Sequence, residues 1–310
     1  MGHDPKTRLA DAAMARAWAL EAAPVRDAQA LFHAYLVAAR AGNVDAMNNV
    51  GLHYAYGDGV PRDDVLGARW LRRAAVKGDA VAAFNLGLFY EKGRGVRKNK
   101  RAARGWYRQA LAGGFREAAG NLADLLFASK DPEDWPEAVK LYRRLVKRGS
   151  ANARYNLGLA YERGKGTRRN RKKALGLYRE LAQAGDVDAQ LALGWCYLNG
   201  VGTPMDALAA FRWYEQAARQ REPRALFSLG EMFLEGLGIP ASRERALRYL
   251  HAATELGHAR SRRWLQQLEG APEEQPPPEP PPIAEPRLRP APEPPPPPGD
   301  DTPPPGPDAS

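Results

Sequence analysis

The chain of 310 residues contains one cysteine, five histidines and no long hydrophobic run. Because Cys196 has no second thiol to pair with, a disulfide within the chain and a zinc cluster of several thiolates are both excluded. The histidines are scattered and lack the spacing of metal ligands, so we expect neither a metal nor a cofactor. No stretch of about 18 apolar residues occurs, which excludes a membrane-spanning helix.

The N-terminus lacks the signals that direct a protein to a membrane or out of the cell. Asp11, Arg16 and Glu21 interrupt its alanine-rich stretch, so the apolar core of a secretion signal is missing. Lys6 occupies the position at which a myristoylation motif requires a hydroxyl residue. We therefore expect a cytoplasmic protein, unless a leader precedes this sequence.

Proline is scarce in the first 270 residues and abundant afterwards, with 19 of the 27 prolines in residues 271–310. This segment has too few backbone donors and too little apolar surface to fold, so we expect a disordered tail. Its eight acidic and two basic residues give it a net charge of −6, whereas residues 1–270 carry +16. A basic body with an acidic tail predicts either acidic partners for the body or a tail that folds back on it.

The proline runs of the tail allow three roles. Residues 276–282 and 294–298 favour a stiff polyproline II spacer. Such a segment can also present a ligand to a proline-binding domain. The third possibility is a solvated linker that binds nothing, and the sequence leaves all three open.

A block that begins Ala46-Met-Asn-Asn-Val-Gly-Leu-His-Tyr recurs along the body. The copies start at residues 46, 82, 118, 153, 189 and 225, so the steps are 36, 36, 35, 36 and 36. Within a copy, alanine, leucine or valine, and an aromatic residue usually follow one another at intervals of four, on one face of a helix. A repeat of this length indicates units that stack and share a continuous core.

Each block is followed by a turn and a second helix. In five units the turn holds a pair of glycines able to adopt positive φ: Gly57/Gly59, Gly93/Gly95, Gly164/Gly166, Gly200/Gly202 and Gly236/Gly238. The predicted N-caps of the second helices are Asp63, Asn99, Asp134, Asn170, Asp206 and Ser242. These helices are expected to bury Trp70, Trp106 and Trp213, and to stop at a glycine, or at Arg221 in one unit.

Five of the first helices carry a glycine at one fixed phase, although glycine in a helix costs about 1 kcal/mol relative to alanine. The positions are Gly51, Gly87, Gly158, Gly194 and Gly230. A small residue at a fixed phase predicts that the partner helix crosses very close to it. This favours antiparallel helix pairs that stack into a superhelix.

The pattern A-x3-LG-x2-Y-x2-G-x-G-V-x2-D-x3-A-x2-WY-x2-A resembles the Sel-one-like repeat family, which is related to tetratricopeptide repeats. The resemblance covers about residues 10–270, and the third full unit departs from it. That unit has Ala128-Ser-Lys-Asp-Pro132 in place of the glycine pair and is one residue shorter, which predicts an altered loop. The family is known for adaptor and scaffold proteins, so the resemblance implies a non-enzymatic interaction protein.

We therefore predict an all-α protein, a right-handed α/α superhelical solenoid of tandem helix-turn-helix repeats with a disordered proline-rich tail. Residues 1–42 form a degenerate first repeat, because Asp27 and Gly42 lie 36 residues before Asp63 and Gly78. Residues 43–257 form six repeats and residues 258–270 a capping helix. Residues 271–310 form the tail.

An asparagine recurs three residues after the repeat alanine in four units. In similar tetratricopeptide arrays the first helices line a concave groove, and an asparagine at this phase hydrogen-bonds the backbone of a bound peptide. The candidate groove residues are Asn49, Phe84, Asn85, Asn121, Tyr155, Asn156, Trp195 and Phe227. The alternative is that the asparagines bond the backbone of the neighbouring repeat and that the aromatic residues are core.

Two turns are strongly basic and lie at the same phase, which predicts a basic edge. Its candidate residues are Arg97, Lys98, Lys100, Arg101, Arg168, Arg169, Arg171, Lys172 and Lys173. Positive charge at a helix start opposes the helix dipole, so stability does not explain it. An acidic protein, RNA or anionic lipid headgroups are the candidate partners. The alternative is that Asp131, Glu133 and Asp134 pair with these cations.

Motifs for catalysis are weak. Gly164-Lys-Gly-Thr167 lacks the spacing of a phosphate loop and is interpreted as a turn. Cys196 is expected to be a buried structural thiol, and no nucleophile–base pair stands out. We therefore predict no enzyme. The predicted function is a scaffold that binds a protein or peptide in its groove, and the alternative is association with nucleic acid or ribosomes through the basic edge.

Overall fold

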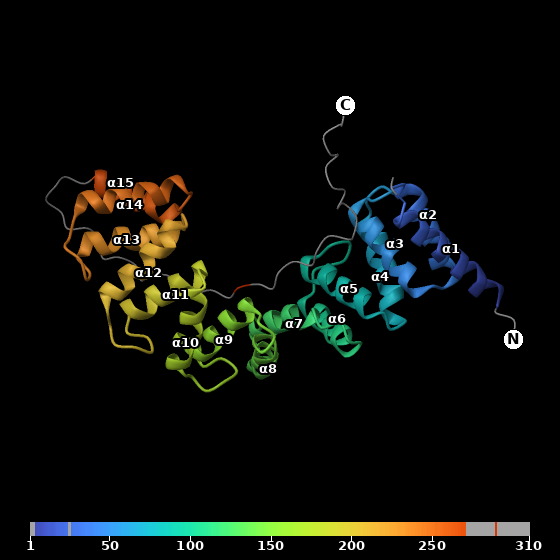
Figure 1. The fold of residues 1–310 in the computed structure, drawn as a ribbon, viewed down its shortest axis with the longest axis horizontal. Helices are drawn as coiled ribbons and strands as arrows, with labels where there is room; N and C mark the ends of the chain where they lie inside the picture. The colour runs from blue at the N-terminus through green and yellow to red at the C-terminus, as the bar shows by residue number, and fades with distance from the viewer. Residues whose placement is uncertain (1–3, 24–25, 271–288, 290–310) are drawn as a thin grey trace, which may run out of the picture. The chain divides into compact units, whose positions relative to one another are not determined.

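The computed structural model describes residues 4–23, 26–270 and 289, and these residues form helices joined by turns, with no strand among them (Figure 1). The helices are α1 (Pro5–Glu21), α2 (Ala28–Ala41), α3 (Val44–Tyr56), α4 (Asp64–Val76), α5 (Ala80–Lys92), α6 (Lys100–Ala112), α7 (Ala118–Phe127), the 3-10 helix η1 (Pro132–Asp134), α8 (Trp135–Val146), α9 (Ala151–Arg163), α10 (Arg171–Gln183), α11 (Val187–Leu198), α12 (Ala207–Arg219), α13 (Pro223–Glu235), α14 (Arg243–Glu255) and α15 (Ala259–Gly270). The predicted all-α class is confirmed. The predicted tail, apart from Arg289, lies outside the described residues.

The chain divides into two compact units. One holds α1 to α6 with the start of α7, and the other holds the end of α7 and α8 to α15 together with Arg289. In both units, helices that follow one another in sequence pack as pairs, such as α5 with α6 and α11 with α12. Each pair also packs against the next, as α4 does with α5 and α10 with α11. The units of the sequence repeat are therefore hairpins that stack.

The turns follow the predicted chemistry in five of the six units. Every glycine of the five Gly-x-Gly pairs has positive φ, between 58° for Gly95 and 80° for Gly93. The side chains of Asp63, Asn99, Asn170, Asp206 and Ser242 accept backbone N–H groups at the starts of the second helices. Left-handed glycines end the first helices α3, α5, α9 and α13, whereas α11 ends at Asn199, just before Gly200. The caps begin the second helices of these five units.

The prediction of Asp134 as a cap is wrong. Asp134 makes no side-chain capping bond; instead Asp131 accepts the N–H of Glu133 at 3.0 Å and starts the 3-10 helix η1. This unit lacks the glycine pair and one residue, so its chain cannot turn as the others do. A short helical turn takes the place of the usual loop.

The glycines of the first helices lie against the second helix of the same pair, as predicted. A Cβ atom on Gly158 would lie 2.5 Å from Cε1 of Tyr178, and one on Gly194 would lie 2.5 Å from Cε1 of Tyr214. At Gly51 the neighbour is smaller, since Cγ of Leu71 would lie at 2.8 Å. The absence of a side chain at this phase lets the two helices approach.

The tryptophans of the second helices are not buried as we predicted. The residue that follows each one, Leu71, Tyr107 or Tyr214, is at most 1% exposed, while the tryptophans are half-buried. The reason is the glycine contact, because the residue after the tryptophan faces the glycine of the first helix. The tryptophan, one position earlier, is rotated by about 100° around the helix axis and so points away from this contact.

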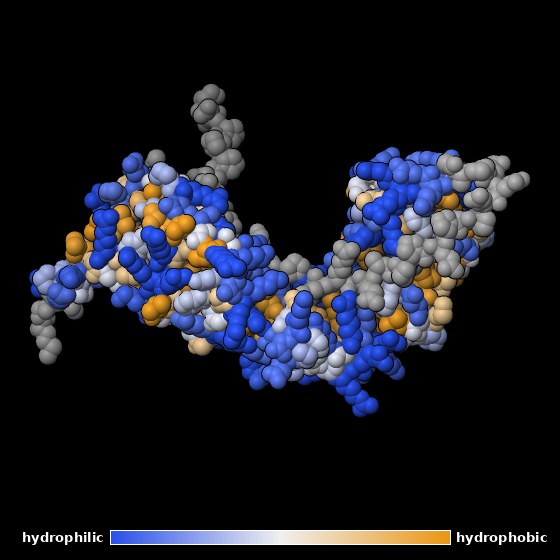
Figure 2. Space-filling view, turned by 180° about the vertical axis from the view of Figure 1, so that it is seen from behind, coloured by the Kyte–Doolittle hydropathy of each residue, from blue (hydrophilic) through white to orange (hydrophobic). Residues whose placement is uncertain are grey.

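One face of the molecule shows how hydrophilic and hydrophobic residues are distributed over the surface. On the face drawn in Figure 2, hydrophilic side chains predominate and hydrophobic ones appear as separate patches between them. The exposed large hydrophobic residues include Trp18, Val76 and Met205. Among the described helices, none has the length and the apolar character required to span a bilayer.

Candidate functional site

Tyrosines of the second helices are tied to carboxylates of the first helices. The hydroxyl of Tyr107 donates to Glu91 at 2.6 Å, and that of Tyr178 donates to Glu162 at 3.0 Å. Tyr35 makes the same contact with Glu21. Burial raises the pKa of these tyrosines well above the usual value, and the neighbouring carboxylates raise it further. The hydroxyls therefore stay protonated and hold each hairpin at a fixed spacing.

The predicted asparagines lie next to this tyrosine row. Side-chain hydrogen bonds from Asn49, Asn121 and Asn156 act on Tyr35, Tyr107 and Tyr142 respectively, and oppose the rise in their pKa. The amide of Asn85 donates instead to Oδ1 of Asn48, in the preceding repeat, at 3.1 Å. These contacts are made to side chains and not to the neighbouring repeat's backbone.

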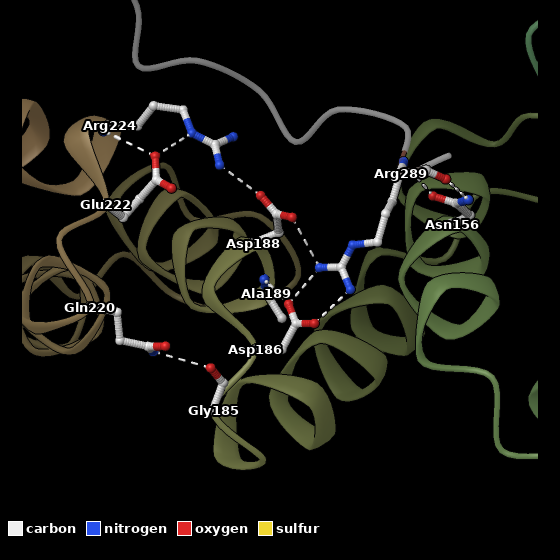
Figure 3. Close-up of polar contacts among 9 residues, drawn as sticks. All are labelled: Asn156, Gly185, Asp186, Asp188, Ala189, Gln220, Glu222, Arg224 and Arg289. Atoms are coloured by element: carbon white, nitrogen blue, oxygen red, sulfur yellow. Dashed lines mark hydrogen bonds and ion pairs between the residues drawn. The ribbon is translucent and has the colours of Figure 1, made fainter. Parts of the chain in front are cut away.

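Asn156 differs from the others because it also binds a peptide backbone. Its Nδ2 donates to the carbonyl oxygen of Arg289 at 2.5 Å, and its Oδ1 accepts the Arg289 N–H at 2.8 Å (Figure 3). Nδ2 also donates to Oδ1 of Asp124 at 3.0 Å, and Asp124 accepts the hydroxyl of Tyr142. The buried amide of Asn156 thus bonds both the backbone N–H and the backbone carbonyl of Arg289. Asp124 fixes the orientation of this amide.

The guanidinium of Arg289 binds two carboxylates at the start of α11, those of Asp186 at the N-cap and Asp188 in the first turn. Its Nη1 and Nη2 donate to the two oxygens of Asp186 at 2.6 and 2.5 Å, and Nη2 also donates to Asp188 at 3.2 Å. Cζ lies 4.6 Å from the centroid of the Tyr155 ring. Figure 3 shows the backbone of Arg289 beside Asn156 and its side chain extending toward Asp186 and Asp188. The fork of the guanidinium matches a carboxylate, and the ring covers the cation.

Electrostatics favour the charged forms of this cluster. Burial raises the pKa of Asp186, but hydrogen bonds from Arg289 and from the N–H of Ala189 outweigh it and leave the pKa below its usual value. Burial lowers the pKa of Arg289, but its bonds to Asp186 and the charge of Asp188 outweigh it, so the net shift is upward. Asp188 also pairs with Arg224 at 2.7 Å. Charges of opposite sign therefore alternate along the cluster.

The aromatic residues of the predicted groove contribute unequally to the surface. Phe84, Tyr155 and Phe227 are at most 4% exposed, whereas Trp195 is half-buried. Phe84 packs against Phe115 with ring centroids 4.9 Å apart, and Phe227 packs against Trp264 of α15. These two contacts are those of core residues. Tyr155 is buried against Tyr178 on one side and covers Arg289 on the other.

All nine residues of the predicted basic edge are exposed. Arg97, Lys98, Lys100 and Arg101 belong to the first unit, at the start of α6. Arg168, Arg169, Arg171, Lys172 and Lys173 belong to the second unit, at the start of α10. The loop lysine Lys165 behaves differently, because its ammonium lies 4.6 Å from the ring centroid of Trp135 and 4.7 Å from that of Phe127.

Cys196 is buried, and burial raises the pKa of its thiol, so it stays protonated as the sequence analysis expects of a structural thiol. A second buried titratable group, Glu231, was not predicted from the sequence. Glu231 is 2% exposed, and neither of its carboxylate oxygens has a hydrogen-bond partner among the described residues. Burial raises its pKa to about 8, although Arg260 opposes this rise. Glu231 is therefore neutral at pH 7 and acts as a core residue.

Sequence reasoning missed the acids that receive Arg289. Asp186 is the N-cap of α11 and was hidden among many capping residues. The signal that distinguishes it is the second acid, Asp188, two residues later and next to the Tyr155-Asn156 pair of the preceding repeat. The position of Arg289 in the tail gave no signal, because Arg287 precedes it in the same context.

Comparisons with known proteins agree with the repeat. The family model of the Sel1 repeat, which is the Sel-one-like repeat, matches residues 44–79, 80–115, 151–186, 187–221 and 223–258, more than half of the chain. The unit with the altered turn falls between the second and third of these matches. No curated protein sequence matches this chain.

Two solved structures are similar in fold and sequence. One is c5321, a protective antigen present in uropathogenic Escherichia coli strains displaying an SLR fold: it is 27% identical with a TM-score of 0.65, and 87% of this chain is aligned. This chain spans 60% of the length of that protein. The other, a Sel1 repeat protein from Oxalobacter formigenes, is 30% identical with a TM-score of 0.58, over 79% of this chain and 96% of its own. The matched repeats, the stacked hairpins and this similarity lead to one conclusion: the chain belongs to the Sel1 repeat family.

Proposed function

We propose that this protein is a non-catalytic scaffold that binds an extended segment of a partner protein in a groove along its first helices. Proteins with Sel1 repeats generally serve as protein-interaction scaffolds rather than catalysts. The partner is a protein or peptide, because a repeat surface of polar amides and aromatic rings matches the regular polar groups and side chains of an extended chain.

The observation that supports the proposal is the contact of Asn156 with Arg289. An amide at the predicted phase accepts a backbone N–H and donates to the carbonyl of the same residue. Such a contact binds the backbone of a ligand and leaves the ligand's side chain free to contact the residues around the asparagine. The other asparagines at this phase, Asn49, Asn85 and Asn121, are partly exposed. Each of them also bonds a side chain of the protein, and we propose that a ligand backbone binds the amide groups that remain.

The groove is preorganised, which favours affinity. The tyrosine–carboxylate bonds and the glycine contacts fix the hairpins before a ligand arrives. Asn156 is held by Asp124, so binding orders few side chains. A preformed site loses less conformational entropy on binding than one that must be assembled.

The proposal is tested with peptides selected from a random display library on the full chain. Their affinities are then measured against Asn85→Ala, Asn156→Ala and a charge-reversed basic edge, in which Arg168, Arg169, Lys172 and Lys173 become Glu. We expect the asparagine variants to lose affinity while the slope of affinity against salt stays unchanged. Thermal unfolding checks that each variant is folded.

The alternative function is association of the basic edge with RNA or an acidic protein. Its support is that all nine cations are exposed and that positive charge at the start of α6 and α10 opposes the helix dipole. The same set of variants separates the two functions. Loss of binding only after charge reversal, with a steep salt dependence, contradicts the groove proposal and favours the alternative.

A further inference from the structure

The junction of α9 and α11 combines three kinds of recognition around one residue. Asn156 binds the backbone of Arg289, Asp186 and Asp188 bind its guanidinium, and the ring of Tyr155 lies against the cation. We infer that this junction is an arginine-selective subsite for an extended peptide, and that the tail of the same chain, at Arg289, is its resident ligand. The inference rests on the proposed groove function and adds to it the class of ligand and a competitor.

The geometry selects arginine over lysine. Two parallel N–H···O bonds join Nη1 and Nη2 to the two oxygens of Asp186, at 2.6 and 2.5 Å. A lysine ammonium is a point donor and cannot make this planar pair, nor stack flat on Tyr155. The side chain of Arg289 is only 15% exposed, so a poorer fit leaves the half-buried carboxylate of Asp186 without its cation.

The subsite does not result from the general charge of the protein. Residues 1–270 carry a net +16 and repel a cation on average, and the tail is acidic. Bulk complementarity therefore predicts contacts from the acids of the tail to the bases of the body. Arg289 makes the opposite contact, with one of only two bases in the tail bound to two acids of the body. The local contacts with Asp186 and Asp188 therefore outweigh the repulsion expected from the net positive charge of the body.

Other junctions of the repeat lack this combination. Between α3 and α5 the corresponding positions hold Asn48 and Asn49 with Asp79 and Val81, so the ring and the second acid are missing. Between α11 and α13 they hold Leu191 and Ala192 with Glu222 and Arg224. At that junction a cation stands where Asp188 stands here, and it repels a bound arginine.

A bound tail competes with partner peptides for the same subsite. Only 18 residues separate Gly270 at the end of α15 from Arg289, so the tethered arginine competes as an intramolecular ligand at a fixed effective concentration. A partner peptide must displace it, and its apparent affinity is reduced by the fraction of time that the subsite is filled. Partners that carry an arginine in an extended segment are those able to do so.

The test measures binding of a fluorescein-labelled peptide, of the sequence of residues 284–294, to the full chain by anisotropy. Four chains are compared: wild type, Arg289→Ala, Arg289→Ala with Asp186→Asn and Asp188→Asn, and Arg289→Ala with Asp79→Asn. Asp79 is the matched control, because it caps α5 as Asp186 caps α11, and asparagine preserves a cap. Arg287→Ala is the matched control in the tail.

We expect Arg289→Ala to bind the peptide at least tenfold more tightly than wild type or Arg287→Ala. The added Asp186→Asn and Asp188→Asn substitutions should weaken this binding at least 30-fold, and Asp79→Asn should not change it. Peptides with Lys or Ala in place of Arg289 should bind at least tenfold more weakly. These peptide variants keep the test valid even if a protein variant fails to fold.

Several results overturn the inference. Equal binding of the arginine and lysine peptides excludes an arginine-selective subsite. Equal binding to wild type and Arg289→Ala, or no binding to either, excludes a resident tail. A concentration-dependent dimer in sedimentation that Arg289→Ala dissolves places the tail in a second copy instead. The proposed groove function survives each of these if library-selected peptides still depend on Asn85 and Asn156.

Discussion

The α9–α11 junction and the α3–α5 junction occupy equivalent places in the repeat and differ in chemistry. Both place an asparagine at one phase of the first helix and an aspartate at the N-cap of the next, Asn156 with Asp186 and Asn49 with Asp79. They differ at the neighbouring positions, where Tyr155 and Asp188 correspond to Asn48 and Val81. Only the first junction binds an arginine in the described residues.

The difference teaches that the repeat separates structure from recognition. Glycines, caps and the tyrosine–carboxylate pairs fix the spacing of the two helices within a hairpin, and they recur in most units. The positions next to the asparagine and after the cap vary, because nothing in the hairpin requires a particular residue there. Each junction can therefore carry a different specificity on one frame.

The largest predicted effect is a pH dependence of stability, and it arises at a variable position that holds a buried acid. Glu231 occupies the phase at which α3 has Leu52 and α9 has Leu159. Its pKa is raised from 4.5 to about 8 in the fold, so the folded state holds a proton that the unfolded state releases above pH 4.5. The contribution of Glu231 to stability is full below pH 4.5 and falls by up to about 1.4 kcal/mol per pH unit until pH 8.

Urea unfolding from pH 4.5 to 8 measures this effect, and Glu231→Gln should flatten the profile. The nearby groups that contribute to the shift, Arg260 and Glu235, stay in place in this variant. Glu255→Gln on the exposed face of α14 removes the same charge and is the control. Parallel profiles for wild type and Glu231→Gln would contradict a neutral buried Glu231.

The second prediction compares the two asparagines directly. In the Arg289→Ala chain, Asn156→Ala should weaken binding of the arginine peptide at least 30-fold, about 2 kcal/mol, because two backbone groups lose their partner. Asn49→Ala should leave the affinity unchanged. Anisotropy titration measures both, with thermal unfolding as the check on folding. Equal losses would mean that the peptide does not choose between the junctions.

The third prediction concerns the frame that the junctions share. Gly158→Ala pushes a methyl against the rigid ring of Tyr178, 2.5 Å away, whereas Gly51→Ala meets the flexible side chain of Leu71. After the gain in helix propensity, we expect Gly158→Ala to destabilise by about 1–2 kcal/mol and Gly51→Ala by less than about 1 kcal/mol. Urea unfolding measures the difference.

The controls for the frame are helix glycines with open space around them. Nothing lies within 4 Å of a Cβ atom built on Gly105 or Gly176. Alanine at either position should stabilise by up to about 1 kcal/mol. If Gly158→Ala stabilises as much as Gly176→Ala does, the close approach of the two helices is not a constraint on the repeat.

The smallest effect is a gain of function. Asn48→Tyr with Val81→Asp gives the α3–α5 junction the residues of the α9–α11 junction, and Leu71 in place of Tyr178 leaves room for the new ring. In a chain that also carries Arg289→Ala, Asp186→Asn and Asp188→Asn, we expect arginine-peptide affinity to rise a few-fold. No gain in titration would show that more than these two positions sets the specificity.

Much of the fold was predictable from the sequence, because its signals are local. The 36-residue period, the glycine turns and the caps each act within a few residues, and the phase of Gly158 and Gly194 predicted the close helix contact. The burial of the tryptophans was predicted wrongly, since the residue one place on faces the glycine. Asp134 failed as a cap because its shortened unit turns through a 3-10 helix.

The candidate site was predictable only in part. The resemblance to tetratricopeptide arrays implied that an asparagine at the phase of Asn156 contacts a peptide backbone, and that phase can be located from the repeat alone. The arginine contact depends on Arg289 meeting Asp186 across about 100 residues of sequence, and no local pattern encodes that meeting. Composition suggested that the tail folds back, but through its acids, because a net charge averages over single sites.

The most direct measurement is the distance between the tail and α11 in the intact chain. Spin labels at Leu288→Cys and at Ala184→Cys, an exposed position before Asp186, are read by double electron–electron resonance, and Cys196 is replaced by serine. We expect a narrow, short distance in this chain and with Arg287→Ala, and a broad, longer one after Asp186→Asn with Asp188→Asn. A broad distribution in every chain, or a narrow one that vanishes on dilution with unlabelled protein, would contradict the bound tail.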